Sequence, residues 1–479
     1  MGKVVKNIKL KDNQIIFFLC SFAAFIRAPF LSFWLEDWDS VQFALGIGEF
    51  SIIKHQPHPP GYPLYIVLAR ILNFFVQNEV LSLTFLSFFL GILAIVPLYL
   101  LSVRMFGRVS AVVSVILYIF IPVSFVLSEI GISNIPGLFF YLLFIYFLYI
   151  DKEKKQYWPW LGFFGGLVLG VRFTEFLIII SLLVFVVVTK GKVREWLSTG
   201  AMFAFGVGVW FVPIILTTGL SNYKIANAST VEYLVRQGRL GSGVFIENVL
   251  VERLSSFFEL FLKGFTPGLA LILLVVVFLT FMNRRLWKEE RFRFIFVWFG
   301  AYFFPFLYLH LRFYYDLHLV QYVLPTLIPL IMLFSYWMGV VAKRGGVIRS
   351  IAFVGLGVLI VNLASVSLKE VALRAWNTPP TIAPVLYVRG SLPVDDTTIV
   401  SSFIYRQFQY YAPEFQNYYG VENIKGKIDS KYIVIDSPTL INEMPFLAKY
   451  KLIKTKKFEE GNLYFSRLKE TEIFIFERV

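Results

Sequence analysis

The sequence predicts an α-helical polytopic membrane protein that ends in a small α/β domain. Of its 479 residues, 57% are hydrophobic and 16% are charged, whereas a soluble globular domain carries about 25% charged residues. The mean hydropathy of +0.70 excludes an ordinary soluble domain. The charged residues lie between long apolar blocks, and only from Lys369 onward does the composition return to that of a soluble domain.

Apolar runs predict about eleven membrane spans. A span needs roughly 20 apolar residues, fewer where the helix is broken. The apolar segment 62–75 is short and contains Arg70, so we expect a helix at the membrane interface there. The predicted spans lie near residues 15–33, 80–103, 109–127, 135–150, 158–171, 173–188, 196–217, 257–282, 294–309, 320–341 and 348–367.

The positions of Lys and Arg predict the orientation of these spans. With the N-terminus inside, the cytoplasmic segments hold twenty Lys and Arg residues, and the opposite segments before the tail hold seven. Lys and Arg gather in cytoplasmic loops, so the net charge of +14 reflects topology and indicates no nucleic-acid partner. We therefore expect a multi-pass protein of the plasma (cytoplasmic) membrane, with its N-terminus inside and its C-terminus outside.

The chain divides into a transmembrane domain, 1–368, and an extracytoplasmic α/β domain, 369–479. About 110 residues are enough for a separate core. Two outer loops, 34–62 and 218–256, exceed ordinary connectors, and long loops are often functional. Alternating runs in the tail predict strands at 398–403, 432–435 and 472–476.

The first outer loop gathers ionisable side chains beside apolar sequence. Asp37 and Asp39 stand just beyond the first span, where a carboxylate can accept a proton from an acceptor hydroxyl. The alternative is that these carboxylates only mark the membrane boundary.

The same loop contains HQPHPPGYPLY, residues 55–65. Its prolines around Gly61 stiffen a turn and can hold the flanking side chains near the membrane surface. His55 and His58 could bind a phosphate or a metal there. The alternative is a plain turn into an interfacial helix.

These motifs resemble those of the GT-C superfamily of membrane glycosyltransferases, and within it the protein O-mannosyltransferase-like group. The resemblance rests on the segment DSVQF at 39–43, on Gly46, and on the box HPPGYPLY at 58–65. The segment LHLVQYVLPTLIPL at 317–330 is also similar to the RYLLPxxP span opening of these enzymes. The likeness covers the membrane region in topology and reaches motif level at two or three places.

The resemblance implies an inverting glycosyltransferase (hexosyl or pentosyl transfer) that uses a polyprenyl-phosphate sugar donor. Its acceptor would be a hydroxyl of a protein, lipid or glycan at the outer face of the bilayer. Asp39 would be the general base, with Asp37 the adjacent candidate, and His58 takes the position of the Lys that meets the donor phosphate in relatives. Glu129 matches a second acidic position, with a role in acceptor orientation or metal binding; the alternative is a charge at a helix start. No cofactor is implied with certainty, and a divalent metal stays open.

The chain departs from the family at one phosphate contact. Relatives have Arg-Tyr before Leu-Pro, whereas this chain has Gln321-Tyr322. A departing phosphate needs positive charge or strong hydrogen-bond donors. The candidate donor-phosphate ligands are therefore His58, His55, Arg312, His318, Gln321 and Tyr322.

Two further interpretations complete the prediction. Arg172 and Glu175 are three residues apart, and we interpret them as a structural ion pair rather than a site. A transporter or flippase of lipid-linked sugars is the alternative function, because it also needs a polar cavity and intramembrane charges. The clustering of charges at one outer face and the lack of an inverted-repeat pattern favour the transferase.

Overall fold

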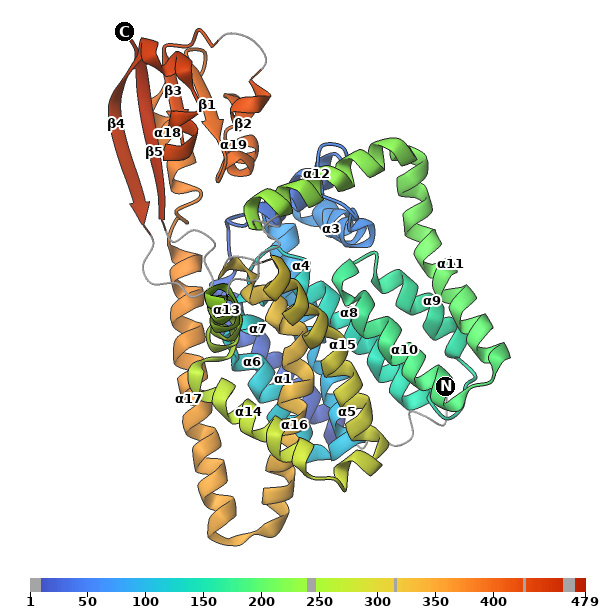
Figure 1. Cartoon of the computed structure of the whole chain (residues 1–479). Helices are drawn as coiled ribbons and strands as arrows, with labels where there is room; N and C mark the ends of the chain where they lie inside the picture. The colour runs from blue at the N-terminus through green and yellow to red at the C-terminus, as the bar shows by residue number, and fades with distance from the viewer. Residues whose placement is uncertain (1–9, 239–246, 314–316, 425–427, 460–469) are drawn as a thin grey trace.

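Helices form the whole membrane domain (Figure 1). The computed structural model describes residues 10–238, 247–313, 317–424, 428–459 and 470–479. Within this described part, 8 helices are long and apolar enough to cross a membrane, or up to 10 if each of two bent pairs is one span. The polytopic helical fold is confirmed; the predicted count of eleven is not.

The straight candidate spans satisfy their backbone hydrogen bonds internally, as a lipid environment requires. They are α1 (Leu10–Arg27), continued by η2 (Ala28–Phe30), α4 (Glu79–Leu93) with α5 (Ile95–Phe106), α8 (Asn134–Asp151), η3 (Phe173–Glu175) with α10 (Phe176–Lys190), α11 (Val193–Thr218), α15 (Glu290–Phe313), η5 (Leu317–Val323) with α16 (Leu324–Arg344), and α17 (Gly346–Trp376).

Prolines break two segments that the sequence predicts as continuous spans. α6 (Arg108–Phe120) and α7 (Pro122–Ser128) meet at 63°, and α13 (Glu247–Phe265) and α14 (Pro267–Met282) meet at 109°. In each pair the second helix begins with proline, which lacks the N–H that would continue the first helix. The predicted span at 158–171 is α9 (Trp158–Val168), whose 11 residues extend only about 17 Å.

Both long outer loops contain helices, which corrects their prediction as plain loops. The first contains α2 (Trp38–Gly48) and leads into α3 (Pro63–Val76), the expected short helix. The second contains α12 (Leu220–Gly238) and the start of α13. Figure 1 shows α12 lying across the upper end of the bundle, near α3. The remaining short element, η4 (Leu286–Lys288), lies between α14 and α15.

The C-terminal segment forms a separate five-stranded sheet, which confirms the predicted α/β tail. The sheet order is β2-β1-β3-β5-β4; β1 pairs in parallel with β2 and β3, and β5 runs antiparallel to β3 and β4. Its elements are α18 (Ala383–Ser391), β1 (Thr397–Ser401), α19 (Tyr405–Tyr411), β2 (Gln416–Tyr419), η6 (Val421–Asn423), β3 (Tyr432–Ile435), α20 (Pro438–Asn442), η7 (Pro445–Lys449), β4 (Tyr450–Glu459) and β5 (Glu470–Arg478).

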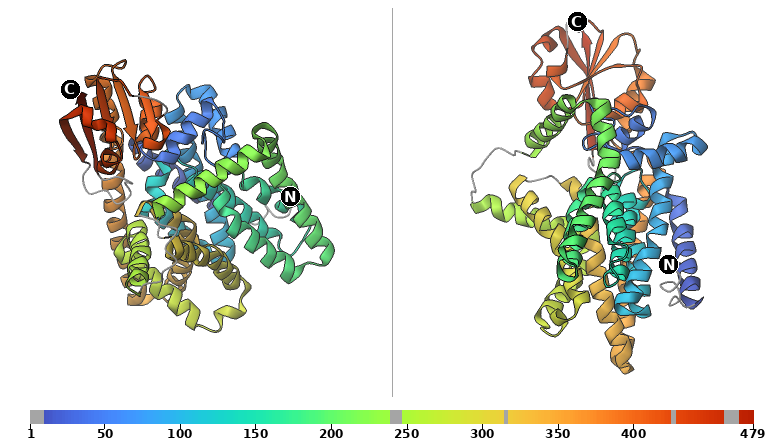
Figure 2. Two further views of the ribbon diagram at one scale, coloured as in Figure 1. Left: turned by 45° about the horizontal axis from the view of Figure 1, so that its top comes forward. Right: turned by 90° about the vertical axis from the view of Figure 1, so that its right-hand side faces the viewer.

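Helices cover both faces of this sheet. Val385 and Phe408 from α18 and α19 pack on one face, while Leu440 and Leu447 from α20 and η7 pack on the other. The sheet stands above the bundle at the upper end of α17 (Figure 2). The last candidate span, α17, therefore leads directly into this domain.

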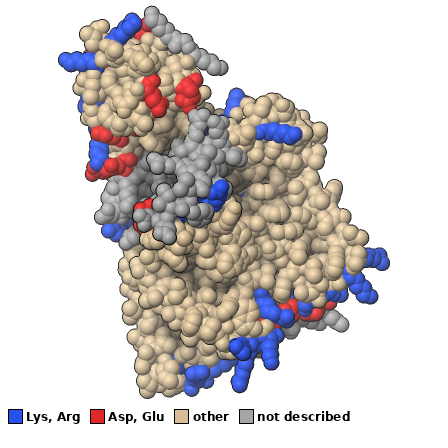
Figure 3. Space-filling model, in the orientation of Figure 1, with Lys and Arg blue, Asp and Glu red and all other residues tan. Residues whose placement is uncertain are grey.

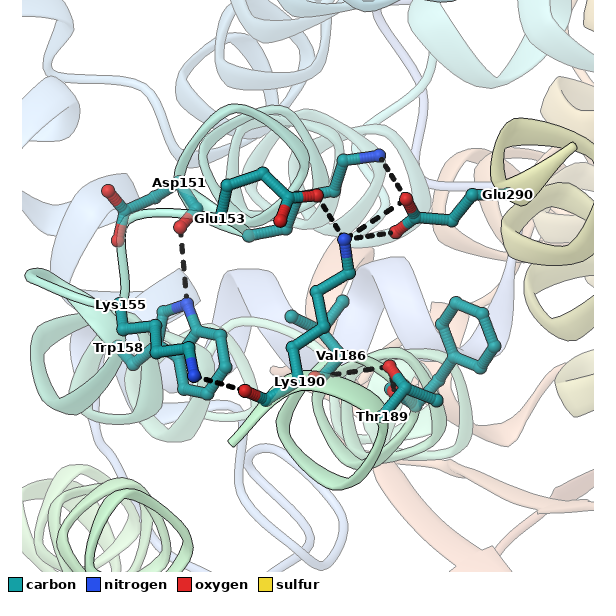
Figure 4. Close-up of polar contacts among 10 residues, drawn as sticks. Asp151, Glu153, Lys155, Trp158, Val186, Thr189, Lys190 and Glu290 are labelled. Atoms are coloured by element: carbon teal, nitrogen blue, oxygen red, sulfur yellow. Dashed lines mark hydrogen bonds and ion pairs between the residues drawn. The ribbon is translucent and has the colours of Figure 1, made fainter. Parts of the chain in front are cut away.

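Charges mark the two ends of the bundle. Figure 3 shows a broad middle belt without charged side chains, with Lys and Arg gathered below it. At that lower end the Lys190 ammonium pairs with Glu153 and, at 2.9 Å, with Glu290, while Lys152 lies 3.2 Å from Glu290 (Figure 4). This network ties together the ends of α8, α10 and α15. The belt fits a bilayer core, where exposed charge is costly.

Candidate active site

Helix α2 holds Asp39 in its first turn. The Asp37 carboxylate caps the helix by accepting the Asp39 N–H at 2.8 Å. At the other end, Arg70 donates to the carbonyls of Ile47 (2.8 Å) and Gly46 (3.0 Å). Both ends of this short helix are therefore satisfied by side chains. Asp37 is committed to the cap, whereas no described residue donates a hydrogen bond to the Asp39 carboxylate.

The proline-rich turn packs directly on α2. Ser51 and Gln56 form an isolated antiparallel bridge before it. A Cβ on Gly46 would lie 3.1 Å from the Gln56 carbonyl oxygen, so the helix approaches the turn through a residue without a side chain. Gly61 has φ +107°, and a Cβ there would lie 2.7 Å from Cδ1 of Ile52. At both positions the close packing therefore requires a residue without a side chain.

The turn places His58 beside Asp39. The His58 Nδ1 lies 3.6 Å from the Asp39 Oδ1 and 2.6 Å from the Gln42 Oε1, which also accepts the His58 backbone N–H at 3.2 Å. Because this oxygen can only accept, Nδ1 carries the proton in the neutral ring. The other nitrogen, Nε2, lies 3.2 Å from the Tyr62 hydroxyl and accepts a hydrogen bond from it.

Burial keeps His58 neutral. It lowers the pKa of His58; the Asp39 carboxylate opposes this shift, and the guanidinium groups of Arg172 and Arg406 add to it. Burial likewise lowers the pKa of His55 to about 4, helped by Arg406 and His58. The Nε2 of His55 contacts the Ser229 hydroxyl of α12 at 3.1 Å. The two histidines are therefore uncharged at neutral pH.

Of the two guanidinium groups that act on His58, that of Arg172 is deeply buried. Its side chain is 6% exposed, its Nη1 donates to the Ser133 hydroxyl at 2.8 Å, and its Nε lies 3.7 Å from Glu175. The predicted Arg172–Glu175 pair is thus confirmed as a contact. The Leu64 N–H donates to the Gly170 carbonyl at 2.9 Å, which joins the HPPGYPLY helix to the segment that carries Arg172.

Polar atoms without partners surround this arginine. The Tyr65 hydroxyl, the Asn134 side-chain carbonyl and the Glu175 Oε2 are buried, and no described residue hydrogen bonds to them. The Tyr322 ring lies 5.6 Å from the Arg172 guanidinium carbon. Buried polar atoms are normally paired, so orphaned groups around a cation indicate a place for a polar ligand.

Of the other predicted phosphate ligands, Gln321 meets this cluster through its backbone, and Arg312 is exposed. Arg312 is exposed at the end of α15, and its backbone carbonyl accepts from Arg253. Gln321 contributes its carbonyl oxygen, 3.4 Å from the Asn134 amide. His318 belongs to η5, but its side chain lies outside the described residues.

Glu129 forms a second buried carboxylate site. Both of its oxygens are buried without a hydrogen-bond partner among the described residues. Burial raises its pKa to about 8, and the Arg27 guanidinium opposes the shift. Its backbone carbonyl accepts the Ser32 N–H at 2.9 Å, so it lies below the start of the first loop.

Metal-ligand geometry is weak in the described part of the chain. No three His, Cys, Asp or Glu side chains gather there in a way that could hold a metal ion. Asp39 and His58 alone make a pair of ligand types, and His58 Nδ1 already donates to Gln42. These residues do not fit a metal centre, and the chemistry proposed below uses none.

The sequence did not show that Gln42 and Tyr62 contact His58 or that Arg172 lies near it. An arginine beside a glutamate at i+3 is typical of a structural pair, and nothing in the sequence shows that the segment meets the first loop. The one available signal was the cost of a charge between two apolar runs, which often marks a functional residue.

Comparison with known proteins identifies the fold. Residues 57–217 match the family described as dolichyl-phosphate-mannose-protein mannosyltransferase; they include the proline-rich turn and Arg172. No curated protein matches the sequence.

Solved structures match over most of the chain. ArnT from Cupriavidus metallidurans bound to undecaprenyl phosphate is 12% identical with a TM-score of 0.58, covering 96% of this chain and 97% of that one. AglB, the archaeal oligosaccharyltransferase from Archaeoglobus fulgidus in complex with an inhibitory peptide and a dolichol-phosphate, is 13% identical with a TM-score of 0.52, covering 89% and 70%. These matches confirm the predicted resemblance to the GT-C proteins at the level of the fold, which the chain shares with ArnT and AglB.

Proposed function

We propose that this protein transfers a sugar from a polyprenyl-phosphate carrier to an acceptor hydroxyl at the outer face of the membrane, with inversion at the anomeric carbon. The observation that carries the proposal is the placement of the Asp39 carboxylate, to which no described residue donates a hydrogen bond, 3.6 Å from neutral His58, with the buried cation Arg172 nearby. The structural neighbours support a lipid-linked donor, because ArnT was solved with undecaprenyl phosphate and AglB with a dolichol-phosphate.

Asp39 is the general base in this reaction. The acceptor oxygen attacks the anomeric carbon and forms the new glycosidic bond while its proton passes to the Asp39 carboxylate. The bond from the anomeric carbon to the phosphate oxygen breaks, and the lipid phosphate leaves with the electron pair. A positioned carboxylate base contributes about 10²–10⁴-fold to such a step.

Arg172 stabilises the leaving phosphate. Negative charge grows on the phosphate as the bond breaks, and a preorganised cation in a dry site acts most strongly at that moment. Neutral His58 carries no charge, and its single N–H donates to Gln42, so Arg172 replaces the arginine that is absent before Leu324-Pro325. Tyr322, whose ring lies 5.6 Å from the Arg172 guanidinium carbon, is suited to a further phosphate contact.

The distribution of charge supports an outward-facing site. Lys and Arg gather at the end of the bundle away from the C-terminal domain (Figure 3), as the positive-inside rule requires of a cytoplasmic face. Asp39 and the C-terminal domain then lie on the outer side, where a polyprenyl-phosphate sugar reaches the site sideways from the bilayer. Glu129 is suited to orienting the acceptor as a neutral acid, which can donate a hydrogen bond.

The test uses the purified chain in lipid with a panel of radiolabelled polyprenyl-phosphate sugars and an envelope extract as acceptor. We expect turnover of one donor by the wild type and loss of that turnover in Asp39→Asn. If no donor is consumed and a lipid-linked sugar instead crosses the bilayer of reconstituted vesicles, equally fast in both proteins, the flippase alternative holds and the transferase is wrong.

A further inference from the structure

The C-terminal domain grips the backbone of the first outer loop just before Asp39. The Tyr411 hydroxyl accepts the Leu35 N–H at 2.8 Å, and the Gln407 side-chain amide donates to the Glu36 carbonyl at 2.9 Å. The Thr381 hydroxyl donates to the same carbonyl at 3.3 Å. Two consecutive loop residues are thus held through their main chain.

Side chains reinforce this grip. The Glu36 carboxylate pairs with Arg374 at the upper end of α17, where Arg374 is 3% exposed and also lies 3.4 Å from Glu370. The Trp34 ring packs 6.0 Å from Tyr411, and the Trp38 ring packs 5.8 Å from Tyr419. The contacts therefore flank Leu35 and Glu36 on both sides.

The gripping helix is itself locked to the sheet. Gln407 and Tyr411 are four residues apart on α19, so they share one face of this helix. The adjacent side of the helix contributes Phe408 to the domain core, against which Tyr411 also packs. The Asp436 carboxylate, directly after β3, accepts the N–H groups of Ser402, Phe403 and Ile404 at 2.7–3.1 Å and fixes the start of α19.

Only two residues separate Glu36, whose carbonyl the C-terminal domain holds, from Asp39 in the first turn of α2. Asp37 caps this helix and Asp39 sits in its first turn, so any rotation of residues 35–36 is passed to the Asp39 carboxylate. A shift of about 1 Å in a reacting group can cost a hundredfold in rate.

We propose that the C-terminal domain is a positioning device for the base, with Gln407 and Tyr411 as positioning residues that hold Asp39 against His58. This inference rests on the proposed transferase reaction. Neither residue touches the reacting atoms; each acts through the backbone of the first loop.

The test compares two double variants of the full chain. Gln407→Met with Tyr411→Phe removes both tethers at nearly constant volume. The matched control, Thr397→Val with Tyr450→Phe, also removes two hydrogen bonds from the same domain, to the carbonyls of Pro393 and Ser430, but none to the first loop.

We expect the tether variant to lose about 10- to 100-fold in kcat, with the KM for the lipid donor changed less than about threefold, because donor binding lies elsewhere. The control should keep the wild-type kcat at a similar melting temperature. Hydrogen exchange over residues 35–41 should accelerate in the tether variant alone.

Wild-type kcat in the tether variant, or an equal fall in both variants, would overturn the inference. The hydrogen-exchange measurement distinguishes a failure of this inference from a failure of the proposed function. If the wild type consumes no donor, the transferase proposal fails, and the exchange of residues 35–41 still decides whether the domain orders this loop. Unchanged exchange would then refute the positioning role.

Discussion

Asp37 and Asp39 stand two residues apart in the first outer loop, and exchanging each for asparagine should separate their roles. The Asp37 carboxylate caps α2 by accepting the Asp39 N–H at 2.8 Å. The Asp39 side chain is 32% exposed, and no described residue donates a hydrogen bond to its carboxylate. Asparagine has nearly the shape of aspartate but cannot take a proton from a hydroxyl.

The structure sets the size of each effect. Asp39→Asn keeps the backbone N–H that bonds to Asp37, so the free energy of unfolding should change by less than about 0.5 kcal/mol, as at other partly exposed positions. Loss of a general base should lower kcat by about 10²–10⁴-fold, which corresponds to about 2.7–5.5 kcal/mol in the activation barrier. Asp37→Asn leaves a side chain that caps helices about as well, so kcat should fall less than about tenfold.

The assay follows release of labelled sugar from the active polyprenyl-phosphate donor, with a thermal denaturation curve for each variant. The reasoning predicts two proteins of similar stability and very different rates. It would be refuted if Asp37→Asn lost as much activity as Asp39→Asn. It would equally be refuted if Asp39→Asn lost its activity only in step with its melting temperature.

Three further predictions test other parts of the site. Arg172→Lys retains a charge beside Glu175 but loses the planar guanidinium group, so donor turnover should fall about 10- to 100-fold. The control, Arg312→Lys at an exposed position, should stay close to wild type in the same assay. Gly61→Ala forces a Cβ onto φ +107° beside Ile52 and should destabilise the fold by about 1–3 kcal/mol in thermal denaturation. Gly48→Ala, with open space around it, is the control. Glu129 has a pKa of about 8 in the fold, so the unfolded chain releases its proton earlier and native stability falls as pH rises from about 4.5 to 8. Glu129→Gln should therefore melt higher than the wild type at pH 8 and equally at pH 4.5; a constant difference at both pH values would contradict the buried neutral acid.

The sequence alone determined the class of the protein. Apolar runs of span length leave helices as the only backbone that satisfies its hydrogen bonds in lipid, and the alternating runs in the tail correspond to β1, β3 and β5. The sequence did not predict β4, because its Lys-rich face is exposed at a sheet edge, where no burial imposes an alternating pattern. α2 escaped because its polar first turn resembles a loop. The predicted number of spans is not confirmed, because prolines bend two of the predicted segments and because α9, with 11 residues, is too short to cross a membrane.

Tertiary structure decided which of the candidate side chains meet. Asp39 and His58 are 19 positions apart in sequence, yet the close approach of Gly46 to the proline-rich turn brings them to 3.6 Å. The Leu64 N–H donates to the Gly170 carbonyl and so links the helix after this turn to the segment that carries Arg172. Residue composition and spacing record local periodicity, whereas such contacts depend on packing between segments far apart in the chain. The placement of Arg172 near His58, and the contacts of the C-terminal domain with Glu36, could therefore be read only from the folded molecule.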